Sequence, residues 1–164
     1  MSAEQQYEFF KFAYEQENTR HRNLIDRAKL YFAAWSAIIG FLFSTTISDE
    51  RFQLHFKGAA LWSGISAIIV FLFCTSCAIG AAVVLTIVAL SIRNYEGLTN
   101  LRKAINISQD DETFYMCRIA DFVVATERNK SNNDIIARNL RLSLWLGAGG
   151  FLLFLLGFVA TRLI

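Results

Sequence analysis

The sequence predicts an all-α integral membrane protein with three transmembrane helices and a cytoplasmic helical bundle. Three stretches without a charged side chain, residues 30–48, 58–92 and 142–161, are each long enough to cross a bilayer. Hydrophobic residues make up 54% of the 164, and 15 of them are Phe. The chain contains no proline, which suits long unbroken helices, because proline removes a backbone donor and kinks a helix interior.

Residues 1–29 are predicted to form a cytoplasmic amino-terminal helical arm. Apolar side chains recur along it every three or four residues, at Tyr7, Phe10 and Tyr14 and again at Leu24, Ala28 and Tyr31. This spacing places them on one stripe of a helix. The stripe can continue without a break into the first predicted transmembrane helix, residues 30–48.

The second apolar run, residues 58–92, has 35 residues, whereas one crossing of the ~30 Å hydrocarbon core needs about 20. Lys and Arg decide between one crossing and two. A single crossing puts 13 of the 16 basic residues on the side of the amino terminus and 3 on the other side, and a hairpin removes this asymmetry. Because Lys and Arg beside spans stay in the cytoplasm, we expect an outer loop at 49–57 and one long transmembrane helix over 58–92. Tilt or extension beyond the bilayer takes up the extra length.

Residues 93–141 form a predicted cytoplasmic helical segment, and residues 142–162 form the third predicted transmembrane helix. The motifs "NISQDDE" and "ERNKSNND" are rich in turn and capping residues, so we expect the segment to divide at both. Ser108, which precedes three acidic residues, is typical of a helix start. The amphipathic helices between these motifs need partners, and a helical bundle would supply them.

Residue types suited to catalysis or metal binding are few. His21 and His55 lie on opposite sides of the membrane in this topology. Cys74 and Cys77 form a C-x-x-C motif inside a span without a second pair, and Cys117 stands alone, so we interpret all three as packing residues. The spans contain no Asp, Glu, Lys, Arg or His, which ion-coupled transport usually needs. We therefore expect no enzyme, no cofactor and no metal, and the net charge of +2 predicts no nucleic-acid partner.

Small and weakly polar residues distinguish the predicted spans. They are Ser44, Thr45 and Thr46 in the first, Gly64, Thr75, Ala82 and Thr86 in the second, and Gly147 and Gly150 in the third. Such residues let helix backbones approach closely and form hydrogen bonds between helices. Hydroxyl groups can also line a pore. Helix packing is the favoured interpretation and a hydroxyl-ringed pore is the alternative, and both lead us to expect a homo-oligomer in the lipid bilayer.

Basic residues are predicted to gather at the cytoplasmic ends of the first and third spans. They are Arg20, Arg22, Arg27, Lys29, Arg138 and Arg141, termed here the basic cluster. Anchoring at the membrane interface is the simpler interpretation, and Trp35 and Trp145 near the same ends would contribute to it. The alternative is a pocket for an anionic ligand, such as a nucleotide phosphate or a lipid headgroup.

The order of these segments resembles a family of small bacterial membrane effectors. A charged helix leads into "RNLIDRAKLYFAAWSAIIGFLFS", and after a hydrophobic stretch and cytoplasmic helices the chain ends in "ARNLRLSLWLGAGGFLLFLLGF". This arrangement resembles the Pycsar-effector transmembrane family of anti-phage nucleotide signalling, and related effectors with two spans. In that family an Asp followed closely by Lys and Ala precedes the first span. Here "DRAK", Asp26–Lys29, occupies that place with Ala and Lys interchanged.

The resemblance implies a protein that is silent until infection and then assembles or opens, so that the bacterial inner membrane loses integrity. No separate cyclic-nucleotide-binding domain fits into 164 residues. The resemblance therefore implies that a nucleotide second messenger acts on the cytoplasmic helices, or that a cytoplasmic sensor protein does. The residues leave a second function open, which is a non-conducting membrane scaffold or anchor for a cytoplasmic partner.

Overall fold

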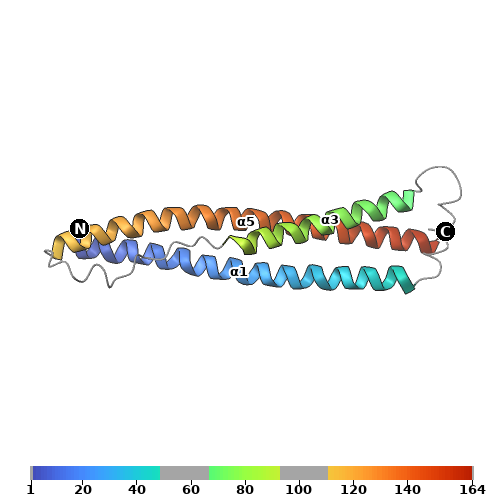
Figure 1. Ribbon diagram of the computed structural model, residues 1–164, viewed down its shortest axis with the longest axis horizontal. Helices are drawn as coiled ribbons and strands as arrows, with labels where there is room; N and C mark the ends of the chain where they lie inside the picture. Colours follow the sequence, from blue (N-terminus) through green and yellow to red (C-terminus); the bar gives the residue numbers. More distant parts are fainter. Residues whose placement is uncertain (1, 49–66, 93–110, 164) are drawn as a thin grey trace. The chain divides into compact units, whose positions relative to one another are not determined.

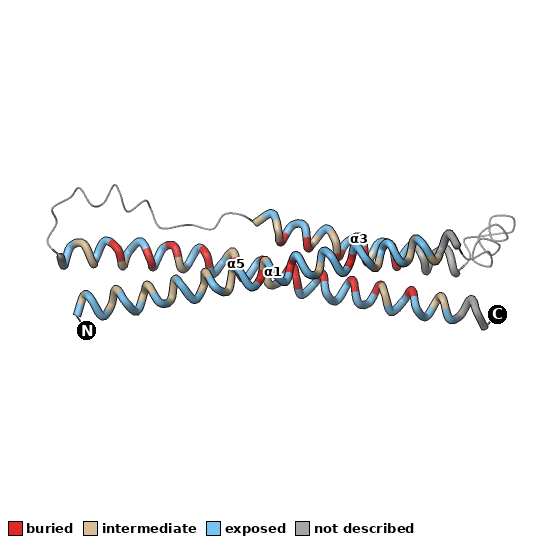
Figure 2. Tube along the Cα trace, turned by 90° about the horizontal axis from the view of Figure 1, so that it is seen from below, coloured by how far each residue is buried: buried red, intermediate tan, exposed pale blue. Residues whose placement is uncertain are grey.

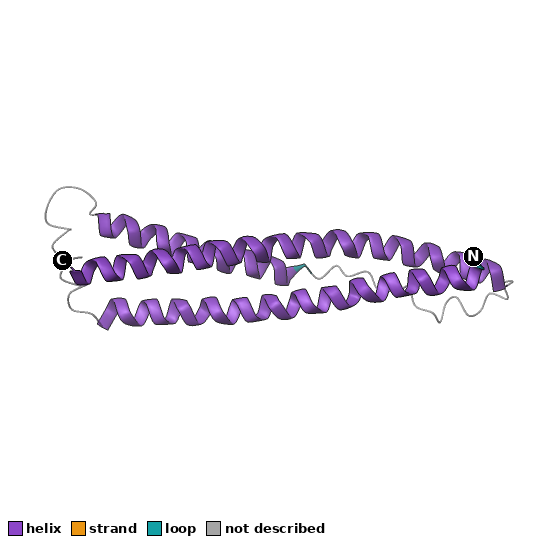
Figure 3. Cartoon of the chain, turned by 180° about the vertical axis from the view of Figure 1, so that it is seen from behind, coloured by secondary structure: helices purple, strands orange, loops and turns teal. Residues whose placement is uncertain are grey.

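The computed structural model describes residues 2–48, 67–92 and 111–163, which form three helices (Figures 1 and 3). Helix α1 spans Ala3–Ser48, α3 spans Ala67–Ser91 and α5 spans Asp111–Leu163. Within these ranges only Ser2 and Ile92 are not helical, so the all-α prediction is confirmed. The predicted outer loop 49–57, residues 58–66 and the expected helix start at Ser108 lie outside the described residues.

Helix α1 begins at a capping box. The Ser2 hydroxyl accepts a hydrogen bond from the Gln5 backbone N–H at 3.2 Å, and Gln5 Oε1 accepts one from the Ser2 N–H at 3.0 Å. These reciprocal bonds satisfy two donors of the first turn. From there α1 continues for 46 residues, so the predicted arm and first span form one helix. Its length of ~69 Å is more than twice the ~30 Å hydrocarbon core of a bilayer.

Helix α5 is also continuous, and the predicted division at "ERNKSNND" is wrong. Asn side chains favour turns when they bond to their own backbone. Here Asn129 and Asn133 are fully buried, and the amide of Asn133 donates to Glu17 of α1. This tertiary partner replaces the local one, so the helix runs through the motif for a total of 53 residues.

The chain divides into two units, and α1 and α5 contribute to both. Unit 1 consists of Met1–Arg27 and Leu90–Arg138, and unit 2 consists of Ala28–Ala89 and Asn139–Ile164. The division therefore falls inside α1 and α5 and two residues before the end of α3. On α1 and α5 it lies a few residues before the predicted start of a transmembrane segment, at residues 30 and 142.

Unit 2 contains three helices, with α3 antiparallel to α1 and α5 (Figure 1). Ser143 of α5 meets Thr86 of α3, and Gly150, farther along α5, meets Ala78, which is earlier in α3. The buried residues are Ala28 and Trp35 on α1, Thr75, Ile79, Ala82, Thr86 and Ala89 on α3, and Asn139, Leu140, Ser143, Gly147, Gly150 and Phe154 on α5. Most of these side chains are small, so the helix backbones can approach closely.

The outer surface of unit 2 is apolar. Figure 2 shows that buried positions alternate with exposed ones along the helices. Large apolar side chains that are exposed include Ile39 and Phe41 on α1, Phe73, Val84 and Ile87 on α3, and Leu152, Leu156 and Val159 on α5. Apolar surface of this extent is rare on soluble proteins and is typical of membrane or protein contact.

Two helical stretches are long and apolar enough to cross a membrane. One is Phe73–Ser91 of α3, and the other lies within Glu112–Val159 of α5. The first predicted span, residues 30–48, is not among them, so the described residues contain two such stretches and not the three expected. Tyr31, Trp35 and Ser36 make this segment less apolar, and the side chains of residues 43 and 46–48 lie outside the described part. The 25 residues of α3 rise ~38 Å, enough for one tilted crossing.

The described helices of unit 1 are a parallel pair, residues 3–27 of α1 and 111–138 of α5. Tyr7 contacts Tyr115 and Phe122 at ring-centroid distances of 5.4 and 5.6 Å, and Tyr14 contacts Phe122 at 5.6 Å. Farther along both helices, Glu17 meets Asn133. Contacts that advance along both helices show that the two run in the same direction. Of the predicted cytoplasmic bundle, the structure describes this pair.

Candidate functional site

A buried polar group, termed here the hydroxyl layer, joins the three helices of unit 2 through Trp35, Thr86 and Ser143. The indole Nε1–H of Trp35 donates to Ser143 Oγ at 3.0 Å, and Ser143 Oγ lies 2.7 Å from Thr86 Oγ1. Both hydroxyls are also within hydrogen-bond distance of the Ala82 carbonyl oxygen, at 2.8 Å from Ser143 and 2.9 Å from Thr86. Ser143 Oγ therefore links α1, α3 and α5.

Two hydroxyl hydrogens serve three oxygen–oxygen contacts in the hydroxyl layer, because each hydroxyl carries a single hydrogen. Two arrangements pair every group. In one, Thr86 donates to Ser143 and Ser143 donates to the Ala82 carbonyl. In the other, Ser143 donates to Thr86 and Thr86 donates to that carbonyl. Either arrangement leaves no unpaired donor in the layer, as burial among apolar side chains requires.

Two glycines of α5 allow the helices to approach at the hydroxyl layer. A Cβ atom at Gly147 would overlap the indole ring of Trp35. A Cβ atom at Gly150 would lie 3.0 Å from Ile79 Cγ1 and 3.1 Å from Ala78 Cβ. Gly147 thus admits α1, and Gly150 admits α3. Gly149, between them in the sequence, has open space where its side chain would be.

The structure places most of the predicted small-residue positions inside a single chain. Thr75, Ala82, Thr86, Gly147 and Gly150 are all buried in unit 2. Ser44 is exposed, and the Thr45 hydroxyl donates to carbonyl groups of its own helix. Gly64 and the side chain of Thr46 lie outside the described residues. The five buried residues therefore serve contacts between helices of one chain.

Trp35 is buried between helices, whereas the sequence predicted an interfacial anchor. It is 6% exposed and covers Gly147, whereas Trp145 is 72% exposed. A buried indole N–H needs a partner, and Ser143 provides it. Sequence reasoning missed both Trp35 and Ser143. The only available signal was the four-residue spacing of Ser143 and Gly147, which puts two small residues on one helix face.

Unit 1 has its own buried polar group around Asn133. The Asn133 amide Nδ2 donates to the Glu17 carbonyl oxygen at 3.0 Å and to Glu17 Oε2 at 2.8 Å, while Oδ1 lies 2.9 Å from His21 Nδ1. Because Asn133 Oδ1 only accepts, His21 Nδ1 carries the hydrogen. The partners of this buried amide, Glu17 and His21, lie one turn apart on α1. The amide therefore favours a single register of the two parallel helices.

Arg20, a member of the basic cluster, forms ion pairs with two carboxylates. Its Nη2 donates to Asp134 Oδ1 at 2.6 Å, and its Nη1 lies 3.5 Å from Glu17 Oε2. The hydrogen bond to Asp134 and the charge of Glu17 raise the pKa of Arg20 above its ordinary value. Two carboxylates therefore offset most of the positive charge that Arg20 could present to a ligand.

The other members of the basic cluster are exposed and divide between the units. Arg22, Arg27 and Arg138 belong to unit 1, and Lys29 and Arg141 belong to unit 2. Arg20 and Arg27 line a common groove in unit 1.

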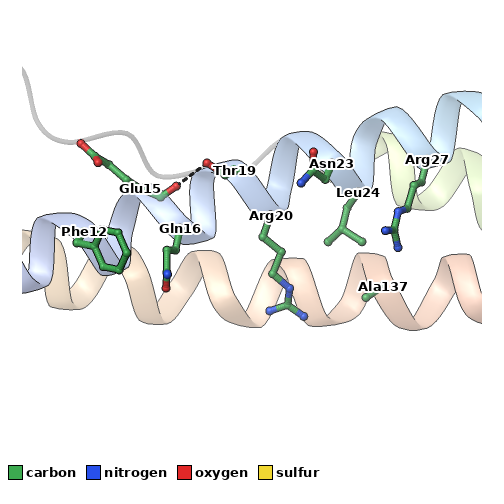
Figure 4. Close-up of a pocket in the computed structure, with 9 residues that line it drawn as sticks. All are labelled: Phe12, Glu15, Gln16, Thr19, Arg20, Asn23, Leu24, Arg27 and Ala137. Carbon is green, nitrogen blue, oxygen red and sulfur yellow. Dashed lines mark hydrogen bonds between the residues drawn. The ribbon is translucent and has the colours of Figure 1, made fainter.

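This groove, with a volume of about 710 Å³, follows α1 in unit 1 (Figure 4). Its lining consists of Phe12, Glu15, Gln16, Thr19, Arg20, Asn23, Leu24 and Arg27 from α1 and Ala137 from α5. The α1 residues recur every three or four positions, so the groove runs along one face of the helix. In Figure 4 the side chains of Arg20, Leu24 and Arg27 point toward α5.

Arg118 is a buried charge of unit 1 that the sequence did not indicate. It is 6% exposed, and its Nη1 lies 3.4 Å from Asp121 Oδ2. Its guanidinium carbon lies 5.8 Å from the ring centroid of Phe114, and such cation–π contacts are favourable. Among the described residues its Nη2 has no hydrogen-bond partner. A buried charge with incomplete pairing is costly, and the contacts with Asp121 and Phe114 offset part of that cost.

Residues that could hold a metal ion do not gather in the described ranges. No group of three His, Cys, Asp or Glu side chains there has the arrangement of a metal site. Cys74, Cys77 and Cys117 are free and exposed. The C-x-x-C motif therefore faces outward from unit 2, so the interpretation of these cysteines as packing residues does not hold within this chain.

Comparison of the chain with protein-family models, curated proteins and solved structures gives no match. Its function is therefore inferred from the residues and contacts described above. Among the described residues, polar side chains converge at the hydroxyl layer of unit 2, and in unit 1 around Asn133 and along the groove.

Proposed function

We propose that the chain is a membrane effector of a bacterial anti-phage defence system, which oligomerises and permeabilises or depolarises the inner membrane when triggered. The resemblance of the first and third apolar segments to such effectors suggests the class. The hydroxyl layer is the observation that carries the mechanism. It holds two hydroxyl groups of the unit 2 core that water can wet, those of Thr86 and Ser143. Both side chains are fully buried, which supports a closed resting state.

Opening in this proposal separates α3 from α5. That movement breaks the contacts of Ser143 with Thr86 and with the Ala82 carbonyl, and it uncovers hydroxyl groups that can line a water path. Several copies are needed, because one layer of two hydroxyls is too small to form a pore. Gly40 and Gly80 have open space around them, which suits close approach by the helix of another copy.

The proposed location is the inner membrane, with the amino terminus in the cytoplasm and one crossing each by α1, α3 and α5. The antiparallel direction of α3 supports this path. The excess of Lys and Arg in residues 1–29 and 93–141 supports the orientation. Because α1 and α5 contribute to both units, a nucleotide or sensor protein that moves these helices in unit 1 acts on the same helices that form unit 2.

Reporter fusions test the proposed path through the membrane. A reporter that is active only outside the cytoplasm is expected to give a signal when fused after Ile164 and none when fused after Gln109. A second reporter, active only in the cytoplasm, serves as the control and should give the opposite pattern. The same reading from both fusions would contradict three crossings.

Membrane potential tests the proposed activity. Cells that express the chain under an inducible promoter are expected to lose their potential, measured with a voltage-sensitive dye, either at high expression or on phage challenge. Thr86→Val keeps the size of the side chain and removes a hydroxyl from the proposed water path, so it should reduce the loss at equal membrane abundance. Ser36→Ala removes an exposed hydroxyl that donates to its own helix and should not change the loss.

A scaffold or anchor for a cytoplasmic partner is the second candidate function. Exposed apolar side chains on unit 1 favour it, namely Phe9, Phe12, Met116, Val123 and Val124, because such surface often marks a protein contact. Unchanged membrane potential in both conditions, with the protein found in the membrane fraction, would reject the effector and leave the scaffold.

A further inference from the structure

We propose that the end of the groove formed by Asn23, Leu24, Arg27 and Ala137 binds a phosphate group. This goes beyond the effector activity, because it assigns a ligand to a defined place in unit 1. The volume of the whole groove, about 710 Å³, is within the ~300–1,000 Å³ typical of small-molecule sites. The side chains at this end supply both donors and apolar contact.

Arg27 is the charge available to a ligand. Within the described part of the chain it has no ion pair or hydrogen bond, whereas Arg20 is occupied by Asp134 and Glu17. The carboxylate of the groove, Glu15, lies twelve positions earlier on α1, about 18 Å away along the helix axis. The groove is therefore positive at the Arg27 end and negative at the other.

Asn23 adds neutral donors beside this charge. It precedes Arg27 by four residues, so the two are neighbours on one face of α1. A guanidinium offers five N–H donors and a side-chain amide offers two, and charge-assisted bonds from Arg to phosphate are strong and often bidentate. Leu24, 8% exposed, and Ala137 give the same end an apolar wall. Phosphate attached to an apolar body fits this combination.

The position of Arg27 on α1 suggests two sources for the phosphate. Arg27 precedes the predicted first span by three residues, a rise of ~4.5 Å, which is the level of lipid headgroups in the proposed membrane placement. A lipid phosphodiester and a soluble phosphate share the chemistry that the site recognises. The lipid source rests on the proposed membrane placement, and neither source rests on permeabilisation.

Equilibrium binding to the purified full-length protein in an uncharged detergent tests the site. The probes are phosphatidylglycerol in mixed micelles and inorganic phosphate, and the readout is the dissociation constant from the ligand-dependent rise in unfolding temperature. Arg27→Gln removes the proposed contact. Arg22→Gln is the matched control, because Arg22 is exposed on the same helix, is not part of the groove lining, and loses the same charge.

Arg27→Gln is expected to weaken binding by about tenfold or more, because it removes a charge-assisted hydrogen bond to the phosphate. Arg22→Gln is expected to weaken it by about fivefold or less, the effect of one basic residue near an anionic surface. Asn23→Asp, which puts a carboxylate four residues before Arg27, should abolish binding by pairing with the guanidinium and repelling phosphate. Far-UV circular dichroism should show unchanged helix content in all three variants.

Each outcome decides the proposal. Binding of phosphatidylglycerol alone, dependent on Arg27, identifies a lipid site, and Arg27-dependent binding of inorganic phosphate identifies a site for a soluble phosphate. If Arg27→Gln and Arg22→Gln weakened binding equally, general surface charge would explain the binding, and the proposed site would be wrong. The site would also be overturned if neither phosphatidylglycerol nor inorganic phosphate bound. Membrane integration, measured separately by carbonate extraction, shows whether the proposed placement fails while the site stands.

Discussion

Replacement of Gly147 by Leu is expected to lower the free energy of unfolding by about 3 kcal/mol. The site has no space, because a Cβ atom alone would overlap the indole ring of Trp35. To accept Leu, either Trp35 leaves its position or α1 moves away from α5. Either change also breaks the hydrogen bond from Trp35 to Ser143.

Gly149→Leu is the matched control for this prediction. Gly149 lies on the same helix two residues later and has open space at the position of a side chain. Both substitutions replace Gly, which has a low helix propensity, with Leu, which has a high one. This difference alone raises helix stability by up to ~1 kcal/mol. The difference between the two variants therefore isolates packing against Trp35. We expect Gly149→Leu to be neutral or slightly stabilising.

The measurement is unfolding of the purified protein in a mild detergent by titration with a denaturing detergent, followed by far-UV circular dichroism. When Trp62 and Trp145 are replaced by Phe, the fluorescence emission comes from Trp35. The wavelength of its maximum should shift in Gly147→Leu. Equal unfolding curves for Gly147→Leu and Gly149→Leu would show that Trp35 does not lie against Gly147.

Ser143→Ala is expected to lower the free energy of unfolding by about 1–3 kcal/mol, the second large effect in unit 2. The substitution removes one oxygen that serves three helices. It leaves the Trp35 Nε1–H without its acceptor in a position that is 6% exposed. Thr86 can still donate to the Ala82 carbonyl, so the cost falls mainly on the contact with α1.

A double-mutant cycle with Trp35→Phe isolates that contact. Phe keeps an aromatic ring over Gly147 and removes the donor, so Ser143→Ala should cost less in the Trp35→Phe background than in the native chain. We expect a coupling energy of about 1 kcal/mol. Ser36→Ala, which removes an exposed hydroxyl bonded within α1, serves as the control and should leave the curve unchanged. If the changes in unfolding free energy of Trp35→Phe and Ser143→Ala were additive, the hydrogen bond between the two side chains would contribute nothing to stability.

Local features of the sequence were sufficient to predict the helices themselves. Charge-free runs and the absence of proline indicated long helices, and the stripe from Tyr7 to Tyr31 indicated that the arm continues into the next segment, as α1 does. The capping and turn residues near Asn133 were misleading. Their side chains have partners on α1, more than 100 positions away in the chain, and no local pattern contains that information.

The sequence by itself determined the helical class, the apolar stretches and the concentration of basic residues in 1–29 and 93–141, because each of these depends on a residue and its near neighbours. Only the tertiary structure decided which small residues face which helix, that Trp35 is buried against Gly147, and that Arg20 is paired while Arg27 is open. The physical reason lies in the apolar helices. When nearly every face of a helix is apolar, hydrophobic periodicity no longer marks the inner face. The inner face is then set by close approach at glycine and by pairing of a few buried polar groups, and these contacts exist only once the helices have met.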